Sequence, residues 1–564
     1  MFNKAAEKTT ALVVLIGAPF TTLFLTTQTV TDPVNATKLF AAGGFGFALI
    51  FILVGFQARA TYSHFKAFVI VSILFLAAAI HTVTSSDAPL SQNLYGSYGR
   101  NTGFIAYLVF TFAGLGMLGL REQTNFKKLL LGLQFAGVVN VIYCGWVIAF
   151  GDFLSWNNPY GNILGFFGNP DFISAFLGIF ISTLVALVAE KTTSWKVKAV
   201  AIIFAALAFI EIVDSHAIQG IVVTAGGLTI VGYFVVRSYL QNKVYSYIYV
   251  LTTLAMGALA VFGTLQKGPF SFVYKTSVSL RGAYWSAGAR MGLDHPFTGV
   301  GMDAYGDWYR RARSLHAATV LPGPKTITNA SHNVIMDFFA YGGWPLLLTY
   351  LGLISIAGIS VVRVIKRSRK YDYIFVAMVA AWACYLAQAI ISINQIGLAI
   401  WGWLLTGALV AYEFSTRPNQ VSSEAANKKS VKKIQNSGVI SPQLVAGIGV
   451  VVGLLVAVPP LSADMKWRTA LNSKNANQVL EVLKPGYLTP NDSTRFAQAA
   501  QILAKSNLID QARQVTLDSI KYNPDYFDAW KILYFLSNTT TEEKATALKN
   551  MKRLDPLNPD VLAE

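Results

Sequence analysis

The chain has 564 residues, of which 54% are hydrophobic and only 13% are charged, and its mean hydropathy is +0.48. A chain of this length that is so apolar is not a soluble globular protein, so the composition indicates a polytopic membrane protein. The formal net charge is +17. Most lysines and arginines lie in short turns between apolar segments, where the bias of cytoplasmic loops accounts for them. We therefore do not expect nucleic acid to be a partner.

The chain consists largely of apolar segments long enough to cross a bilayer, which takes about 20 residues of helix. The sequence therefore predicts an all-α bundle of about 13 transmembrane helices. The first segment lacks a small-residue cleavage site and is followed by another, so we expect it to be retained as an anchor. The thirteen segments are 11–30, 38–56, 65–82, 102–120, 128–149, 171–189, 198–213, 219–236, 245–263, 334–362, 373–393, 396–414 and 442–460.

The orientation of the bundle is predicted by its basic turns, because cytoplasmic loops carry an excess of Lys and Arg. All of these turns fall on one side when the segments are threaded in order. The amino terminus is therefore expected inside and the carboxy terminus outside. The basic positions are Lys4 and Lys8; Arg59 and Lys66; Arg121, Lys127 and Lys128; Lys191, Lys196 and Lys198; Arg237 and Lys243; Arg363 to Lys370; and Lys428 to Lys433.

Composition divides the chain into six predicted parts. The polar, basic residues of the fourth part are typical of a disordered linker. The parts are an N-terminal membrane bundle (1–263), an extracytoplasmic loop (264–333), the rest of the bundle (334–414), a cytoplasmic linker (415–441), a last transmembrane helix (442–461) and an extracytoplasmic helical domain (462–564).

The C-terminal part contains a weak internal repeat. Two apolar stripes, at 497–504 and 508–520, are followed by Asn523-Pro524, which recurs 35 residues later as Asn558-Pro559 with Ala529-Trp530 and Leu533 between. This period resembles that of tetratricopeptide helix pairs. We expect a small tetratricopeptide-like domain that acts as a docking surface for a protein partner.

The extracytoplasmic loop carries the most conspicuous cationic group, Arg281. On a helix over 279–292, Trp285 lies about 40° and Gly288 about 20° around the axis from Arg281. One helix face would thus present the guanidinium of Arg281, the flat indole ring of Trp285 and open space at Gly288. Such a face suits a diphosphate with sugars attached. An interfacial arginine that contacts lipid headgroups or a loop carboxylate is an equally acceptable interpretation. Arg310 and Arg311 add to the positive charge, which would attract an anion.

His332 is the second residue of interest in this loop. It follows Asn329 and Ser331, which are good helix caps, so we expect it in the first turn of the helix that re-enters the membrane. The positive end of the helix dipole disfavours an imidazolium there, and a neutral imidazole can act as a general base toward an acceptor hydroxyl. A purely structural, capping histidine is the alternative. Asp337 lies too far around the helix to orient the imidazole.

Other polar groups lie on the same predicted side and complete the candidate site. Arg100 precedes a helix, and Asn169 is expected as an N-cap before Pro170. Glu211, Ser215 and Gln219 lie at the outer membrane boundary, where an ionisable group is costly and often functional, although Glu211 could equally pair with a neighbouring arginine. The chain has no HExxH motif, no paired cysteines and no Gly-rich phosphate loop. Asp303 and Asp307, four residues apart, could share a metal, but a solvated loop face is the favoured interpretation. We therefore expect neither a metal nor a cofactor.

These segments resemble a known family. RGAYWSAGARMGLDHPFTGVGMDAY (281–305) and SHNVIMDFFAYGGWPLLL (331–348) are similar to the signature loop of the O-antigen ligase and polymerase superfamily, which are GT-C class membrane glycosyltransferases. GSYGRNTG, GNPDF and SINQIGLAIWGWLL are also similar to segments of bacterial members that have a tetratricopeptide tail. The resemblance covers about residues 85–415.

The resemblance implies a multi-pass protein of the bacterial cytoplasmic membrane that transfers a glycan from an undecaprenyl-diphosphate carrier onto a lipid, glycan or protein acceptor. The transfer would proceed with inversion and without a metal. Arg281 would bind the donor diphosphate, and His332 would activate the acceptor. Many members have a second phosphate-binding arginine in a Ser-Arg-Gly motif, where this chain reads Ser215-His216-Ala217-Ile218-Gln219-Gly220. Arg100 would then replace that cation, or the reaction differs in detail.

Ligase, polymerase and protein-glycosylating activities all fit these features. A transporter of lipid-linked glycans would also have polar groups within a helix bundle, but it needs a path that opens to both sides. A structural scaffold that presents the C-terminal helices would leave the loop around His332 unexplained.

Overall fold

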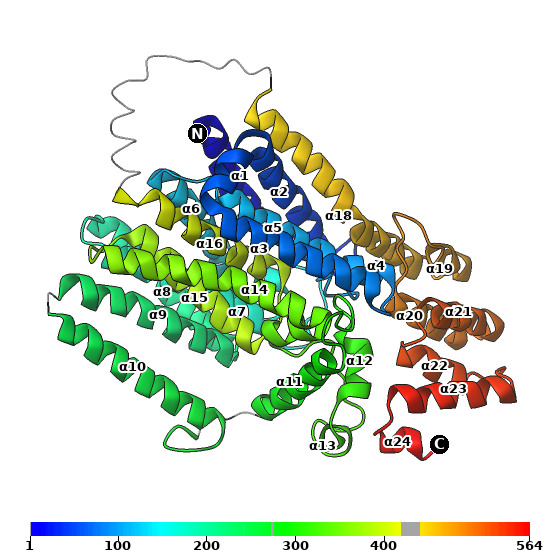
Figure 1. Ribbon diagram of the computed structural model, residues 1–564. Helices are drawn as coiled ribbons and strands as arrows, with labels where there is room; N and C mark the ends of the chain where they lie inside the picture. Colours follow the sequence, from blue (N-terminus) through cyan, green and yellow to red (C-terminus); the bar gives the residue numbers. More distant parts are fainter. Residues whose placement is uncertain (1, 241, 272–273, 275, 419–439) are drawn as a thin grey trace.

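The computed structural model describes residues 2–240, 242–271, 274, 276–418 and 440–564 (Figure 1). The regular elements in these ranges are all helices, and an isolated bridge between Gly486 and Thr489 is the one extended pairing found there. The predicted all-α class is therefore confirmed for this part of the chain. Most of the predicted linker, residues 419–439, lies outside the described residues.

Ten helices of the described residues are long and apolar enough to cross a membrane, so the chain is a multi-pass membrane protein by the length and composition of its helices. They are α2 (Asn35–Phe56), α3 (Ala58–Ser85), α6 (Gln123–Phe150), α7 (Pro170–Ala189), α9 (Ile218–Tyr239), α10 (Lys243–Thr264), α14 (Val334–Arg367), α15 (Tyr373–Ile391), α16 (Ile396–Ser415) and α18 (Pro442–Ser473).

Three further predicted segments are helical but fall outside this set. α1 (Lys4–Leu23) and α8 (Trp195–Asp214) have charged residues near their ends, and α5 (Phe104–Met117) has only 14 residues. The predicted count of 13 crossings therefore stays a prediction, whereas a bundle with ten candidate spans is what the structure contains.

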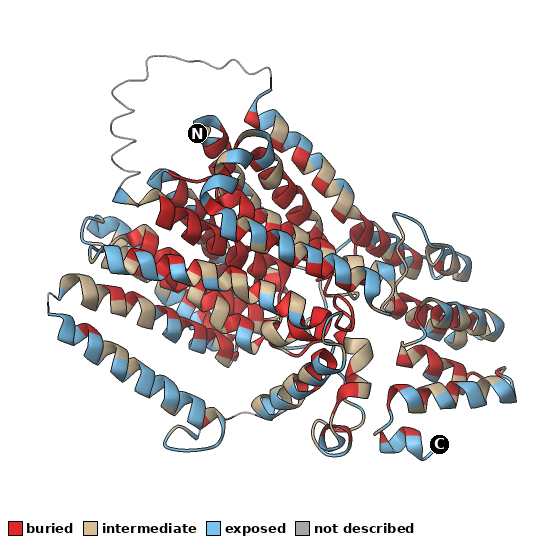
Figure 2. Ribbon diagram, viewed as in Figure 1, coloured by how far each residue is buried: buried red, intermediate tan, exposed pale blue. Residues whose placement is uncertain are grey.

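Burial separates the inner helices from those that face the surroundings (Figure 2). The most apolar stretch of α16 is completely buried inside the protein, whereas that of α10 has no buried residue although it is equally suited to a membrane. A helix that is apolar yet exposed all round is stable when lipid covers it. α10 is thus the peripheral helix of the bundle, and α16 is its centre.

The extracytoplasmic loop of the prediction folds into three helices, α11 (Thr276–Asp294), α12 (Tyr305–Ala312) and α13 (Leu315–Thr319). It is fixed to a break in α14 at Gly342 and Gly343, where the helical backbone is interrupted. Backbone amides of the loop donate to carbonyls beside the break, from Val300 to Ala340 at 2.9 Å and from Gly301 to Tyr341 at 3.1 Å. The break therefore exposes main-chain groups that hold the loop against the bundle.

The C-terminal residues form pairs of helices at the end of the bundle opposite to the amino terminus (Figure 1). α20 pairs with α21, and α22 pairs with α23, and α20 and α22 begin 34 residues apart, at 493 and 527. We call residues 476–564 the tail. Its helices are α19 (Ala476–Val482), α20 (Ser493–Lys505), α21 (Ile509–Tyr522), α22 (Phe527–Phe535), α23 (Thr541–Leu554) and α24 (Pro559–Leu562).

α18 runs without interruption from the membrane bundle into the tail. It continues to Ser473, beyond the domain boundary expected at residue 461. The physical reason is that Trp467 and Ala470 are buried in the first hydrophobic cluster of the tail. The same helix therefore serves as a membrane span and as a wall of the tail.

α2 and α18 are packed backbone to backbone. A Cβ atom added to Gly43 would lie 2.6 Å from the carbonyl oxygen of Gly453, and one added to Gly449 would lie 2.6 Å from that of Phe47. Gly449 and Gly453 have the small-xxx-small spacing that lets membrane helices approach closely. This contact fixes α18, and with it the start of the tail, against the bundle.

We predict that Gly453→Leu destabilises the protein by about 1–3 kcal/mol, because the new side chain has no space against the backbone of α2. Gly447→Leu, on the same helix, is the matched control, since a Cβ there meets no atom within 4 Å. Thermal unfolding of both variants in the same detergent measures the difference. Equal melting temperatures for the two variants would contradict the close packing of α2 and α18.

Candidate functional site

A buried ion pair joins the segment before α5 to the loop. Arg100 Nε lies 3.3 Å from Asp303 Oδ1, and the exposed fractions of the two side chains are 6% and 0%. Tyr341 of α14 donates its hydroxyl to Asp303 Oδ1 at 3.2 Å, and the Ser97 amide donates to Oδ2 at 2.9 Å. Both carboxylate oxygens are thus satisfied. The Arg100 guanidinium extends to the carbonyl of Asn329, 2.7 Å away, three residues before His332.

His332 lies just outside α14 and not in its first turn as expected. Asn333 is the N-cap, and its side chain accepts from the amides of Ile335 and Met336 at 2.9 and 3.2 Å. His332 precedes it with a φ of 57°, a left-handed conformation that is uncommon for residues other than glycine. Expecting Asn329 or Ser331 to be the cap was wrong, because Ser331 donates instead to Asp337 Oδ1, at 2.8 Å through both its amide and its hydroxyl.

The surroundings of His332 keep its imidazole neutral. Burial, together with the positive charges of Arg100 and Arg281, lowers the pKa of His332 to about 4. The helix dipole was the expected cause, whereas the causes found are desolvation and the two guanidinium groups. The ring of Tyr284 lies 5.7 Å from the imidazole ring, centroid to centroid. His332 therefore has a neutral ring next to Tyr284 and two arginines close enough to affect its charge.

Arg281 and Trp285 lie on α11, which packs against α14 and α12. Among the described residues, Arg281 Nε and Trp285 Nε1 are buried and have no hydrogen-bond partner. The neighbouring Gly288 faces the residues beside His332, since a Cβ added there would lie 3.6 Å from Ser331 Cβ. This face of α11 presents hydrogen-bond donors without acceptors, as a site for an anionic ligand requires.

A cleft of about 450 Å³ lies between the loop and the tail, and His332 is one of its walls. We call it the roof cleft. Burial raises the pKa of Asp307 in this cleft to about 6, against the opposing effect of its amide and arginine neighbours. Its walls are Ser97, Tyr98, Tyr284, Gly306, Asp307, Arg310, Ile327, Thr328, Asn329 and His332 from the membrane part, and Thr494, Tyr526, Phe527 and Asp528 from the tail.

Arg310 and Arg311, expected as substrate ligands, form ion pairs with the tail. Arg310 Nη1 lies 3.2 Å from Asp555 Oδ2, and Arg311 Nη1 lies 3.1 Å from Asp525 Oδ2. Arg313 joins them, since its Nη2 lies 2.6 Å from Asp555 Oδ1 and both side chains are fully buried. We call these three arginines and their acidic partners the clasp. Its positive charge is compensated within the protein, so an anionic ligand would have to compete with the tail for it.

The remaining predicted residues form a second group, on the helices α7 to α9. Asn169 caps α7 as expected and accepts from the amide of Asp171 at 2.8 Å. Glu211 Oε2 and both side-chain amide atoms of Gln219 are buried, without a hydrogen-bond partner among the described residues. The Ser215 hydroxyl donates to the carbonyl of Ile212 at 2.7 Å. α8 and α9 pack against α7, whereas α11 packs against α14 and α12, so this group is separate from Arg281 and His332.

Sequence reasoning missed several residues of the site. Tyr98, Asp303, Asp307 and Tyr341 surround Arg100 or the roof cleft, and the tail adds Tyr526 and Asp528. Asp303 and Asp307 had been considered only as a metal-binding pair or as a solvated loop face. No local signal in the tail indicates that its side chains reach the loop. In the described ranges, no group of three His, Cys, Asp or Glu side chains is placed to hold a metal ion.

The comparisons with known proteins do not assign the chain to a family. No protein-family model matches it, and no curated protein is similar enough to count as a relative. Inference about its activity therefore depends on the site itself and on the resemblance of its loop.

We predict that Asp555→Asn weakens the attachment of the tail by about 3–5 kcal/mol, because it leaves the fully buried Arg313 without its counter-charge. Glu543→Gln is the matched control. It removes a carboxylate from a pair with Arg513 that is partly exposed, 32% and 23% for the two side chains, and such pairs contribute about 0–1 kcal/mol.

The measurement is the rate at which a protease cleaves the tail of the protein in detergent micelles, under conditions where opening is fast relative to cleavage. If the clasp holds the tail, the protease should cleave the Asp555 variant much faster than the Glu543 variant. Equally slow cleavage of both would show that the clasp does not hold the tail.

Proposed function

We propose that the protein is a membrane glycosyltransferase that moves a glycan from an undecaprenyl-diphosphate-linked donor onto an acceptor hydroxyl, in the manner of an O-antigen ligase. The single observation that carries the proposal is the environment of His332. A neutral imidazole lies at the wall of a cleft, with Arg100 and Arg281 near enough to lower its pKa. A base beside two guanidinium groups, of which Arg281 keeps a donor without a partner among the described residues, suits a reaction in which a hydroxyl attacks while a diphosphate leaves.

Arg281 is the main ligand of the donor diphosphate in this proposal. Its Nε has no protein partner among the described residues, and a guanidinium binds phosphate oxygens bidentately. Trp285, with a free indole N–H on the same helix, is placed to contact the first sugar. Arg100 already has the carboxylate of Asp303 as its partner. It therefore attracts the diphosphate electrostatically rather than binding it through a pair of free N–H donors. It thereby stands in for the second arginine of the family motif.

The reaction then proceeds in one displacement. His332 accepts the proton of the acceptor hydroxyl, and the oxygen forms a bond to the anomeric carbon of the glycan. The bond from that carbon to the diphosphate breaks, and the electron pair leaves with the diphosphate, whose charge Arg281 and Arg100 stabilise. Attack from the face opposite to the leaving group inverts the anomeric centre. The arginines supply the charge stabilisation that a metal provides elsewhere.

Donor binding would also strengthen the base. Free His332 is a weak base because two arginines and burial lower its pKa. A diphosphate on those arginines cancels their positive charge and places a negative charge near the imidazole, which raises its pKa toward its ordinary value. Proton transfer is thereby favoured only when the donor is in place.

The acceptor would enter through the roof cleft. Tyr98, Tyr284 and Tyr526 offer flat aromatic surfaces there, and Asp307 and Asp528 offer carboxylates that can accept from hydroxyl groups. These groups suit a sugar or another hydroxylated acceptor. The same site would serve a polysaccharide polymerase or a protein O-oligosaccharyltransferase, and we keep both as alternatives. The tail, which we interpret as tetratricopeptide-like, would then present or select the acceptor.

In the proposed topology the chain crosses a bacterial cytoplasmic membrane 13 times. The amino terminus is cytoplasmic, and the loop, the roof cleft and the tail are extracytoplasmic. α1, α5 and α8 would then cross together with the ten helices that qualify by composition. A transporter of lipid-linked glycans is the less favoured alternative, because it needs a path that opens to both sides, whereas the proposed site residues lie on one side in this topology.

We predict that His332→Ala lowers turnover by about 10²- to 10⁴-fold and leaves donor binding intact. The experiment uses purified protein in liposomes with an undecaprenyl-diphosphate-linked glycan, and it measures turnover per folded molecule and donor binding on one preparation. Arg281→Lys is the companion variant, and it should lose donor affinity because an ammonium cannot reproduce the bidentate fork. If binding and turnover of His332→Ala fall in proportion, His332 is structural, and Asp307 is the next candidate base.

The pH dependence gives an independent prediction. In the free protein His332 is neutral above about pH 4, so the acidic limb of kcat/KM should lie near that pH. In the complex the bound diphosphate favours the protonated imidazole, so the acidic limb of kcat should lie at higher pH. An acidic limb of kcat/KM near pH 6, where Asp307 titrates, would identify Asp307 as the base and contradict the role of His332.

A further inference from the structure

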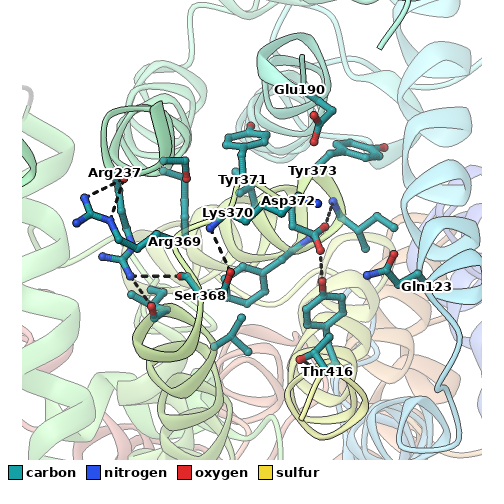
Figure 3. A pocket seen from close by; sticks show the side chains of 18 of the residues that line it. Gln123, Glu190, Arg237, Ser368, Arg369, Lys370, Tyr371, Asp372, Tyr373 and Thr416 are labelled. Carbon is teal, nitrogen blue, oxygen red and sulfur yellow. Dashed lines mark hydrogen bonds between the residues drawn. The ribbon is translucent and has the colours of Figure 1, made fainter. Parts of the chain in front are cut away.

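A second hollow lies at the other end of α14 from His332. It has a volume of about 640 Å³ and is lined by the ends of α6, α7, α9 and α16 and by the turn between α14 and α15 (Figure 3). His332 precedes the first residue of α14, whereas Arg367, its last residue, lines this hollow. We call it the distal pocket. The basic turns predict that it faces the cytoplasm.

The lining of the distal pocket is strongly cationic. Five lysine and arginine side chains contribute to it, against only two acidic side chains, Glu190 and Asp372. An excess of positive charge in a hollow attracts anions, and the hollow concentrates the potential. The five are Lys127, Arg237, Arg367, Arg369 and Lys370.

The two carboxylates are already engaged by neutral donors. Asp372 caps α15, accepting from the amides of Ile374 and Phe375 at 3.0 and 3.3 Å, and it also accepts the hydroxyl of Tyr412. Glu190 accepts from the amide of Thr192 at 3.4 Å. Neither forms an ion pair with a cation of the pocket, among the described residues. The acidic groups therefore stabilise the local backbone and are not paired with a pocket cation, and the five cations still outnumber them.

Two of the cations are held rigidly by backbone carbonyls. Arg237 donates to the carbonyls of Ile365 and Ser368, and Arg369 donates to the carbonyl of Arg237 at 3.0 Å (Figure 3). This reciprocal contact ties the end of α9 to the turn after α14 without cancelling a charge. Arg367 differs, since it pairs with Glu413 at 2.9 Å. The other four cations form no ion pair with a carboxylate of the described residues, and Arg237 and Arg369 among them are fixed in position.

The pocket also has an apolar side. Leu187, Phe234 and Val376 line it together with the cations, and α7, α9 and α15, which carry them, are candidate membrane spans. A hollow at the ends of membrane helices that combines cations with apolar side chains fits a phosphate group with acyl chains attached better than a freely soluble anion. We propose that the distal pocket binds the phosphate group of an anionic membrane lipid.

The test compares lipid binding to two doubly substituted variants by native mass spectrometry of protein released from micelles that contain phosphatidylglycerol. Lys127→Gln with Lys370→Gln removes two pocket cations. Lys196→Gln with Lys198→Gln makes the same charge change on α8, at two positions that do not line the pocket. We expect the affinity for phosphatidylglycerol to fall by about 30-fold in the first variant and to be unchanged in the second. An equal loss in both would overturn the proposal, because it would reflect general surface charge.

Two further binding measurements distinguish an anionic lipid from a freely soluble phosphate as the ligand of the pocket. Phosphatidylcholine should not occupy the pocket, and inorganic phosphate should compete only at far higher concentration than the lipid binds. Competition by inorganic phosphate at the lipid's own concentration would overturn the lipid assignment in favour of a soluble anion.

A measurement on the unsubstituted protein keeps the proposal testable if the first variant does not fold. Phosphatidylglycerol with a photoactivatable headgroup should crosslink to the turn between α14 and α15, residues 368–372. Crosslinks confined to other parts of the protein would overturn the proposal. None of these measurements depends on the glycosyltransferase activity.

Discussion

The ion pair between Arg100 and Asp303 is the contact on which the geometry of the candidate site depends. Its charges are almost completely removed from water, and such a pair is stable only when further hydrogen bonds satisfy the remaining donors and acceptors. Tyr341 and Ser97 provide them for the carboxylate, and the Asn329 carbonyl does so for the guanidinium. Three segments distant in the sequence are thereby fixed together: the turn before α5, the turn before α12 and the start of α14.

This arrangement also accounts for the unusual state of His332. His332 lies between Asn329, whose carbonyl accepts from Arg100, and α14, whose Tyr341 donates to Asp303. It has a left-handed backbone conformation and lies outside the helix that follows it. Burial and two nearby arginines keep the ring neutral. Strain of this kind persists only where the surrounding structure imposes it, and it is concentrated at functional sites. The tail adds a second constraint on the roof cleft. The ion pairs of the clasp hold the tail residues that form one wall of the cleft, so the shape of the cleft depends on the position of the tail.

Much of the fold was accessible from the sequence because it follows from local patterns. The apolar segments are helices, Asn169 caps α7 before Pro170, and Arg281 shares a helix face with Gly288, which faces the residues beside His332. Each depends on residues close together in the chain. The N-cap of α14 was misassigned because Asn329, Ser331 and Asn333 are all good caps. Only tertiary structure distinguishes them: Asn333 accepts from the first amides of the helix, and Ser331 donates to Asp337 instead.

The partners of the loop arginines could not be predicted in the same way. Arg310 and Asp555 are 245 residues apart, and the composition of the loop alone suggested a surface open to an anionic substrate. Likewise, nothing near Arg100 indicates that Asp303 neutralises it. The continuation of α18 into the tail depends on the burial of Trp467 against helices that follow it. Contacts of this kind are set by tertiary packing, which periodicity and capping rules do not contain.

The central claim is that Arg281 and His332 share one site for a lipid-linked diphosphate. The most direct test is an experimental structure of the protein in nanodiscs that contain undecaprenyl diphosphate. The account predicts the diphosphate within hydrogen-bonding distance of the Arg281 guanidinium and next to the His332 imidazole, with the Arg100–Asp303 pair intact. A diphosphate bound elsewhere, with Arg281 and His332 free of it, would contradict the account.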